Sequence, residues 1–280
     1  MPADTGFPRA DVENDFLRAR RRQVLARLVQ RLRREPDDVN LILPFDDVVA
    51  ALGRVGERRL GLQTIRLDRI VGTVDSSRDF DRRFRPTSNR VRERWERLAL
   101  AQRRGESIPP IDVYQVGELY FVEDGHHRVS IALASGAKTI EAYVTQVDTE
   151  LPASGIRGHR DLLFKSYERI FRERVPLGGP AMAKITVTDP WSYAELGEAI
   201  EAWGYRRMQD AGQFSDRAET AQHWYAEEYL PVVRMMRAAD LIGTRTDAEA
   251  YLRVAAERYR LILAHEWSDE IVERLRGKVK

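Results

Sequence analysis

Five consecutive residues could carry chemistry in this sequence: Asp124, Gly125, His126, His127 and Arg128. A glycine lets the chain turn sharply, and a helix that begins directly after it leaves its first backbone amides without carbonyl partners. These free amides and the helix dipole both favour a bound anion. Arg128 adds a forked donor that matches phosphate, and the two imidazoles add hydrogen-bond donors or a base. The turn is therefore predicted to bind phosphate or a nucleotide.

Asp124 would repel a bare phosphate, so its role needs a separate explanation. A carboxylate at such a site can act as a general base, accept a hydrogen bond from a hydroxyl group, or share a Mg²⁺ ion with the phosphates. His126 and His127 are the other candidate catalytic residues. Neighbours on a helix point in different directions, which argues against a metal ion held by this pair. The protein ligands of any metal stay unknown, and a simple turn with capping histidines is the structural alternative.

The elements that must position this turn can also be predicted from the sequence. Apolar runs at residues 111–114 and 119–122 predict a β-hairpin. The pattern then becomes helical over residues 126–134, and Gly136 stands where a C-terminal cap is expected. Alternation over residues 139–145 predicts a further strand.

This strand–turn–helix pattern, preceded by Ile108-Pro109-Pro110, resembles the N-terminal domain of ParB-type partition proteins, a fold shared by sulfiredoxins and a group of free-serine kinases. The resemblance covers residues 63–147. The matching ParB segment carries a Gly-x-Arg-Arg element that contacts a CTP triphosphate, and the serine kinases carry a form similar to the one here. The resemblance implies nucleotide binding. Sulfiredoxins have a cysteine at this element, and this chain has none, so peroxiredoxin repair is not implied.

The loop at residues 74–85 is a second candidate segment, because it is dense in charges of both signs and has no period. In ParB-like domains the segment after the first strand approaches the nucleotide from the side opposite the Gly-x-Arg turn. By this resemblance Arg78, Asp79, Asp81 and Arg82 are candidate nucleotide-binding residues, and the phenylalanines of the loop would anchor it in the core. A surface cluster of salt bridges is the alternative, with equal weight.

An amphipathic helix is predicted at residues 11–34, before this domain. Eight arginines and no acidic residue lie within residues 17–34, and they are expected to form a solvated face. A shorter helix is expected at residues 45–52 and a first strand at residues 63–67. The apolar positions that fall on one face of the long helix are Leu17, Val24, Leu25, Leu28, Val29 and Leu32.

The sequence after residue 147 predicts a mainly helical region. A Pro/Gly/Ser-rich stretch at residues 152–158 marks the boundary. One short strand is expected at residues 184–188. Thr246 and Glu249 form a capping box for a helix that would continue to about residue 265, and a last helix is expected at residues 268–276.

These patterns predict an α/β (α+β) fold. Residues 1–60 would form an N-terminal helical extension, residues 61–150 a small mixed-sheet domain of the ParB/sulfiredoxin type, and residues 151–280 a mainly α-helical domain. The expected function is nucleotide binding with Mg²⁺, and phosphotransfer or nucleotide hydrolysis is a further hypothesis. Two alternatives are a DNA-binding ParB-like regulator and a non-catalytic interaction module.

Composition bounds the partners and the compartment. The net charge is only +2, no apolar run has the length of a membrane span, and the chain has no cysteine, which is usual in the cytoplasm. The helices after residue 150 offer no basic element that could read DNA bases, so weak or no nucleic-acid binding is expected. A homodimer through the C-terminal helices is a further hypothesis.

Overall fold

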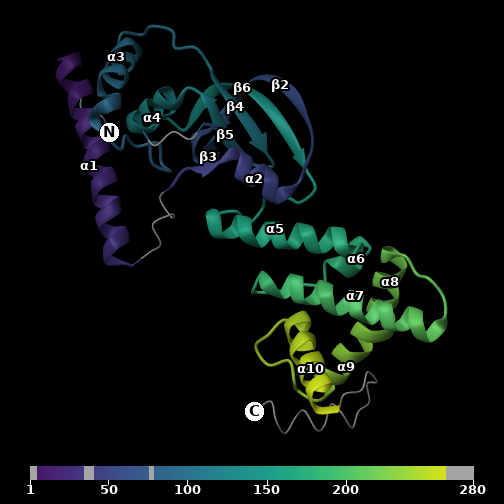
Figure 1. Cartoon of the computed structure of the whole chain (residues 1–280). Helices are drawn as coiled ribbons and strands as arrows, with labels where there is room; N and C mark the ends of the chain where they lie inside the picture. Colours follow the sequence, from purple (N-terminus) through teal and green to yellow (C-terminus); the bar gives the residue numbers. More distant parts are fainter. Residues whose placement is uncertain (1–4, 35–40, 76–78, 263–280) are drawn as a thin grey trace. The chain divides into compact units, whose positions relative to one another are not determined.

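The chain divides into two compact units, Met1–Leu162 and Leu163–Lys280, each described here by itself. The structure is a computed structural model that describes residues 5–34, 41–75 and 79–262. The first unit contains a six-stranded mixed sheet with helices, and the second is helical (Figure 1). This combination confirms the predicted α/β class.

Two neighbouring parallel strands that are distant in sequence, one ending at Thr73 and the other at Asp124, end at the same edge of the sheet. Its strands run in the order β1-β3-β5-β4-β6-β2. β4 and β5 form the predicted antiparallel hairpin, while β3 lies parallel to β5 and β4 lies parallel to β6. The strands are β1 (Leu43–Pro44), β2 (Arg54–Arg66), β3 (Ile70–Thr73), β4 (Ile111–Val116), β5 (Leu119–Asp124) and β6 (Thr139–Thr149).

Two strands are longer than the sequence predicted. β2 begins at Arg54 rather than at residue 63, and β6 continues to Thr149 rather than ending at residue 145. The two strands pair antiparallel along almost their whole length. Most of β2 is exposed or only half-buried, so no apolar alternation marks its first half in the sequence, and backbone hydrogen bonding to β6 defines it instead.

In the described residues, the α-helices that lie wholly in the first unit are α1 (Pro8–Leu32), α2 (Phe45–Leu52), α3 (Arg92–Arg103) and α4 (His126–Ser135). The predictions for α2 and α4 are confirmed, and Gly136 caps α4 with a left-handed φ of 83°. α3 buries Trp95 and Ala99.

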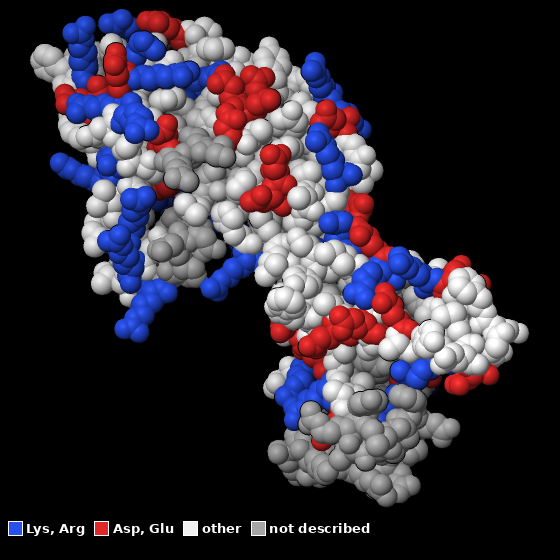
Figure 2. All heavy atoms as spheres, viewed as in Figure 1, with Lys and Arg blue, Asp and Glu red and all other residues white. Residues whose placement is uncertain are grey.

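The prediction was wrong about which face of α1 packs. Val12, Phe16 and Ala19 are buried, and the Phe16 ring meets the edge of Trp95 at 5.6 Å between ring centroids. The six apolar residues expected to form the apolar face are 37–80 % exposed. Ion pairs explain the difference, because Arg103 of α3 holds Asp15 at 2.6 Å and Asp11 at 3.4 Å, which turns the acidic side of α1 inward. Figure 2 shows arginine side chains crowded over this helix.

The second unit packs its helices around one apolar core. Leu196, Trp224 and Met236 are fully buried in that core. Thr246 and Glu249 cap α10 reciprocally, as predicted. The helices are α5 (His159–Arg174, which begins in the first unit), α6 (Gly179–Met182), α7 (Trp191–Ala211), α8 (Arg217–His223), a π-helix (Trp224–Tyr229), α9 (Leu230–Ala238) and α10 (Asp247–Ile262).

The strand expected at residues 184–188 was wrong. Ile185 and Val187 are buried, but this segment is irregular and packs on the helical core. Its alternation therefore reflects burial against helices rather than pairing with another strand. The predicted end of α10 near residue 265 and the helix at 268–276 lie outside the described residues. Among the described residues, no helix has the length and apolar character needed to cross a membrane.

Candidate functional site

The predicted turn is formed as a strand, one left-handed glycine and a helix. Gly125 follows β5 with φ 110° and ψ 18°, and no side chain in the described part of the chain caps the helix at this position. A Cβ atom on Gly125 would lie 2.4 Å from Ile111 Cγ2, so a larger residue does not fit here. The amide of Val129 bonds the Gly125 carbonyl at 3.0 Å, which closes the first helical turn. The preceding amides have no acceptor within the helix and are available to an anion.

His126 is held in one orientation and one tautomer by Thr73. His126 Nε2 lies 2.6 Å from Thr73 Oγ1, and that hydroxyl group also lies 3.1 Å from the Val122 carbonyl. The carbonyl can only accept, so the single hydroxyl hydrogen is donated to it and His126 must donate through Nε2–H. Nδ1 keeps its lone pair. Burial lowers the pKa of His126, and the nearby carboxylates of Asp75 and Asp124 only partly oppose this effect, so the ring is neutral near pH 7.

His127 is neutral as well. Burial lowers its pKa to about 4, with a smaller contribution from the positive charge of Arg94. The Phe80 ring meets the imidazole edge-on at 5.2 Å between centroids. His127 Nδ1 is buried without a hydrogen-bond partner in the described part of the chain. This atom therefore lacks the hydrogen bond that buried polar atoms usually make.

We expect His127 to titrate near pH 4, well below the ordinary histidine value of 6.5. Its folded pKa is the lower one, so the unfolded chain binds more protons between these values. The free energy of unfolding should then fall as pH drops from 6.5 towards 4 and be unaffected above 6.5. Side-chain NMR gives the midpoint, and thermal unfolding of His127→Gln should show a smaller acid-dependent loss. A midpoint near 6.5 would contradict the buried, neutral ring.

The Arg128 guanidinium group bonds other groups of the protein in this structure. It donates to the carbonyls of Pro109 (at 2.9 Å) and Pro110 and pairs with Asp124. The Arg128 side chain is 13 % exposed, whereas that of Asp124 is 63 % exposed. Arg128 therefore ties the start of α4 to the segment before β4, and Asp124 remains open to solvent and to a ligand.

Among the described candidates from the 74–85 loop, Asp79 lies within electrostatic reach of the histidines. Its negative charge raises the pKa of both His126 and His127, although burial outweighs that effect. Arg82 is directed elsewhere, since its guanidinium lies beside Gly158 and its main charged neighbour is Asp161. Arg78 lies outside the described residues.

Asp81 has a structural role in this arrangement. Its buried carboxylate accepts hydrogen bonds from the backbone amides of Arg83 and Arg85, both at 3.0 Å, and from Arg85 Nε at 2.8 Å. These bonds close the loop that carries Phe80 and Phe84. Both rings are buried, as predicted, and lie about 6 Å from the His126 ring. The loop thus forms one wall behind the histidines.

The sequence alone did not identify Thr73 and Asp75 as residues of this site. Thr73 ends β3 directly opposite Val122 of β5, and the two strands are parallel. Carboxyl ends of neighbouring parallel strands meet at the same edge, where ligands bind in open α/β sheets. The pairing of β3 with β5 was the missing information, because it alone places Thr73 beside the turn.

The comparisons give weak likenesses. No protein-family model and no curated protein matches the chain. Sulfiredoxin from Arabidopsis thaliana is similar at 23 % identity over 31 % of this chain and 86 % of that chain, with a TM-score of 0.23. Two structures of a pNOB8-like ParB N-domain are similar at 11 % identity over 74 % and 75 % of this chain and 82 % and 79 % of theirs, with TM-scores of 0.23 and 0.22. These belong to the same two families as the motif resemblance, but values this low carry no argument about activity or ligand.

Proposed function

We propose that the N-terminus of α4 binds the phosphates of a nucleotide. The supporting observation is the open first turn of this helix behind Gly125, with two neutral imidazoles beside its free amides. The backbone amides can donate to phosphate oxygen without bringing a full charge, and so can the one N–H of neutral His127, whereas the single N–H of His126 is donated to Thr73. Arg128 holds the turn in place from behind, and Arg78 remains a candidate phosphate contact.

Mg²⁺ would resolve the charge conflict at this turn. Asp75, Asp79 and Asp124 all act on His126 electrostatically, and their negative charges would oppose the proposed phosphates. Mg²⁺ is usually held by one or two carboxylates, water and substrate phosphates rather than by a complete protein cage. This agrees with the described residues, which contain no group of three or more His, Asp or Glu able to hold a metal alone. The bound ion would supply charge neutralisation between the carboxylates and the phosphates.

Asp124 and His126 are the residues that could move a proton. Asp124 is the exposed carboxylate at the turn, and His126 keeps a lone pair on Nδ1. In phosphotransfer or hydrolysis, one of these bases accepts the proton of an attacking hydroxyl group or water. The new oxygen–phosphorus bond then forms as the bond to the nucleoside diphosphate breaks. Asp79, Asp81 and Arg82 would act on the ligand through the loop that carries them.

Asp124→Asn is expected to keep nucleotide binding and to lose turnover by about 10²–10⁴-fold, because the amide cannot accept the proton. Thermal shift with nucleotides, with and without Mg²⁺, measures binding, since a ligand present at about 100 times its Kd stabilises by about 2.7 kcal/mol. Phosphate release or transfer measures turnover. Asp148→Asn, at an exposed carboxylate of β6, is the matched control. No stabilisation of the wild type by any Mg²⁺–nucleotide would refute the proposal.

A further inference from the structure

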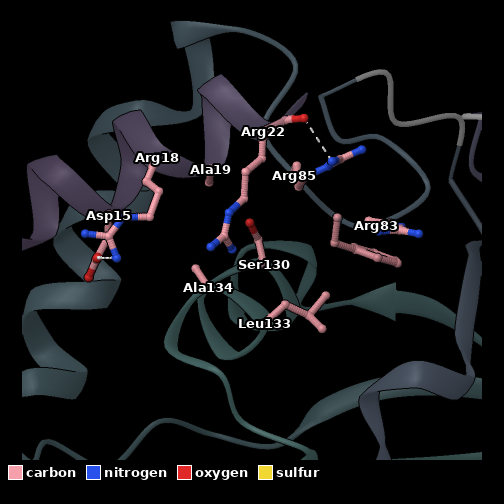
Figure 3. Close-up of a pocket in the computed structure, with 10 residues that line it drawn as sticks. Asp15, Arg18, Ala19, Arg22, Arg83, Arg85, Ser130, Leu133 and Ala134 are labelled. Carbon is pink, nitrogen blue, oxygen red and sulfur yellow. Dashed lines mark hydrogen bonds and ion pairs between the residues drawn. The ribbon is translucent and has the colours of Figure 1, made fainter. Parts of the chain in front are cut away.

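A pocket lies on the first unit, and none of the residues of the Asp124–Arg128 turn lines it. It is a cavity of about 200 Å³ between α1, the loop at 83–85 and α4 (Figure 3). Four arginines line it, Arg18, Arg22, Arg83 and Arg85, together with a single carboxylate, that of Asp15. The lining therefore has a marked excess of positive charge.

Two of these arginines already have partners. Arg85 pairs with Asp81 at 2.7 Å and donates to the Arg22 carbonyl at 3.0 Å. Asp15 is held by Arg103 at 2.6 Å and lies 3.7 Å from Arg18. The negative charge of Asp15 is thus largely neutralised by these two arginines.

Arg22 and Arg83 have no ion-pair partner for their guanidinium groups within residues 5–34, 41–75 and 79–258. Figure 3 shows the Arg22 side chain reaching from α1 across the cavity towards Ser130 of α4. An arginine that projects over a pocket and has no carboxylate partner presents several N–H donors to a ligand in that pocket.

Ser130 adds a donor at the floor of the cavity. It is 3 % exposed, and its Oγ accepts a hydrogen bond from Trp95 Nε1 at 3.0 Å. Its own hydroxyl hydrogen remains to be donated, and no acceptor for it is found in the described part of the chain. Donors therefore face the cavity from both α1 and α4. Phe84, Leu133 and Ala134 provide an apolar surface beside them.

We propose that this cavity binds a phosphoryl group, either free phosphate or the phosphate of a small monoester. A tetrahedral oxyanion offers several acceptor oxygens and a negative charge that balances the positive charge of the arginines. The forked donors of a guanidinium group match the spacing of its oxygen atoms. The cavity is smaller than the roughly 300–1,000 Å³ usual for drug-sized ligands. It therefore suits one phosphate with a few carbon atoms packed on Leu133 and Ala134, rather than a whole nucleotide.

Arg22→Gln tests this site, because it removes the fork and keeps the backbone carbonyl that Arg85 uses. Arg21→Gln is the matched control, at an exposed residue of the same helix that does not line the cavity. The probes are inorganic phosphate, ribose 5-phosphate and ribose, at an ionic strength balanced with chloride. Calorimetry should show that both phosphates bind the wild type and Arg21→Gln, that ribose does not bind, and that Arg22→Gln binds at least about tenfold more weakly.

The outcome also separates the two sources of the phosphoryl group. Tighter binding of ribose 5-phosphate than of phosphate points to an organic ester that uses the apolar surface, and equal binding points to free phosphate. Absence of binding, or equal affinity in all three proteins, overturns the proposal. Arg22→Gln, whose substituted side chain lines this cavity and not the Asp124–Arg128 turn, should keep its thermal stabilisation by Mg²⁺–nucleotide, so the two proposals can fail separately.

Discussion

Gly125→Ala is expected to lower the free energy of unfolding by about 2–5 kcal/mol and to abolish stabilisation by nucleotide. The residue has φ 110°, and its new Cβ would lie 2.4 Å from Ile111 Cγ2 and 3.1 Å from Arg128 Nε. A positive φ costs an L-residue about 1–2 kcal/mol. Forcing a methyl group into a filled core adds about 1–3 kcal/mol. Relief of the clash would move Ile111 or the start of α4, and either shift displaces the free amides.

Gly136→Ala is the matched control for this prediction. Gly136 caps the other end of α4 with φ 83°, and an added Cβ would meet nothing within 4 Å. This variant should lose only the backbone cost, about 1–2 kcal/mol, and should keep its response to nucleotide. Urea denaturation of both variants gives the comparison, provided that the m-values agree. Equal losses would show that the contact with Ile111 is not decisive at Gly125.

The sequence predicted the elements that short-range rules define. Gly125 and Gly136 mark the two ends of α4, because only glycine enters the left-handed region readily. The Thr246–Glu249 capping box marked the start of α10, since both of its hydrogen bonds lie within four residues. The hairpin of β4 and β5 follows in the same way from two apolar runs around one turn.

Long-range pairing decided what the sequence could not predict. Arg128 was correctly placed at the helix start, but its donors go to Pro109 and Pro110 rather than outward. The packing face of α1 depends on Arg103, which lies far along the chain from Asp15. Apolar periodicity alone favoured the leucine face, because it does not count ion pairs. In each case the sequence shows that a donor is present, but the tertiary structure determines which acceptor it bonds.

Asp81→Ala is expected to lower the free energy of unfolding by about 3–5 kcal/mol, the usual cost of removing one partner from a buried ion pair. Asp81 is buried, and its carboxylate accepts from two backbone amides and from Arg85. Without it these donors lose their acceptor, and the loop that places Phe80 and Phe84 against His126 is no longer closed. Chemical denaturation measures the loss, and Glu118→Ala is the control. Glu118 pairs with Arg69 but is largely exposed, so its removal should cost within about 1 kcal/mol.

Asp81→Asn separates the structural role from the ligand-binding role that the sequence suggested for this residue. Its remaining carbonyl oxygen can still accept from the amides of Arg83 and Arg85, while its amide nitrogen faces the Arg85 guanidinium as a second donor. The free energy of unfolding of Asp81→Asn should therefore lie between those of the wild type and Asp81→Ala. Nucleotide affinity, measured at a temperature where all three proteins are folded, should follow the order of stability. If Asp81→Asn keeps full stability but binds nucleotide at least about tenfold more weakly, the carboxylate contacts the ligand or its Mg²⁺, because a tenfold change is about 1.4 kcal/mol of binding free energy.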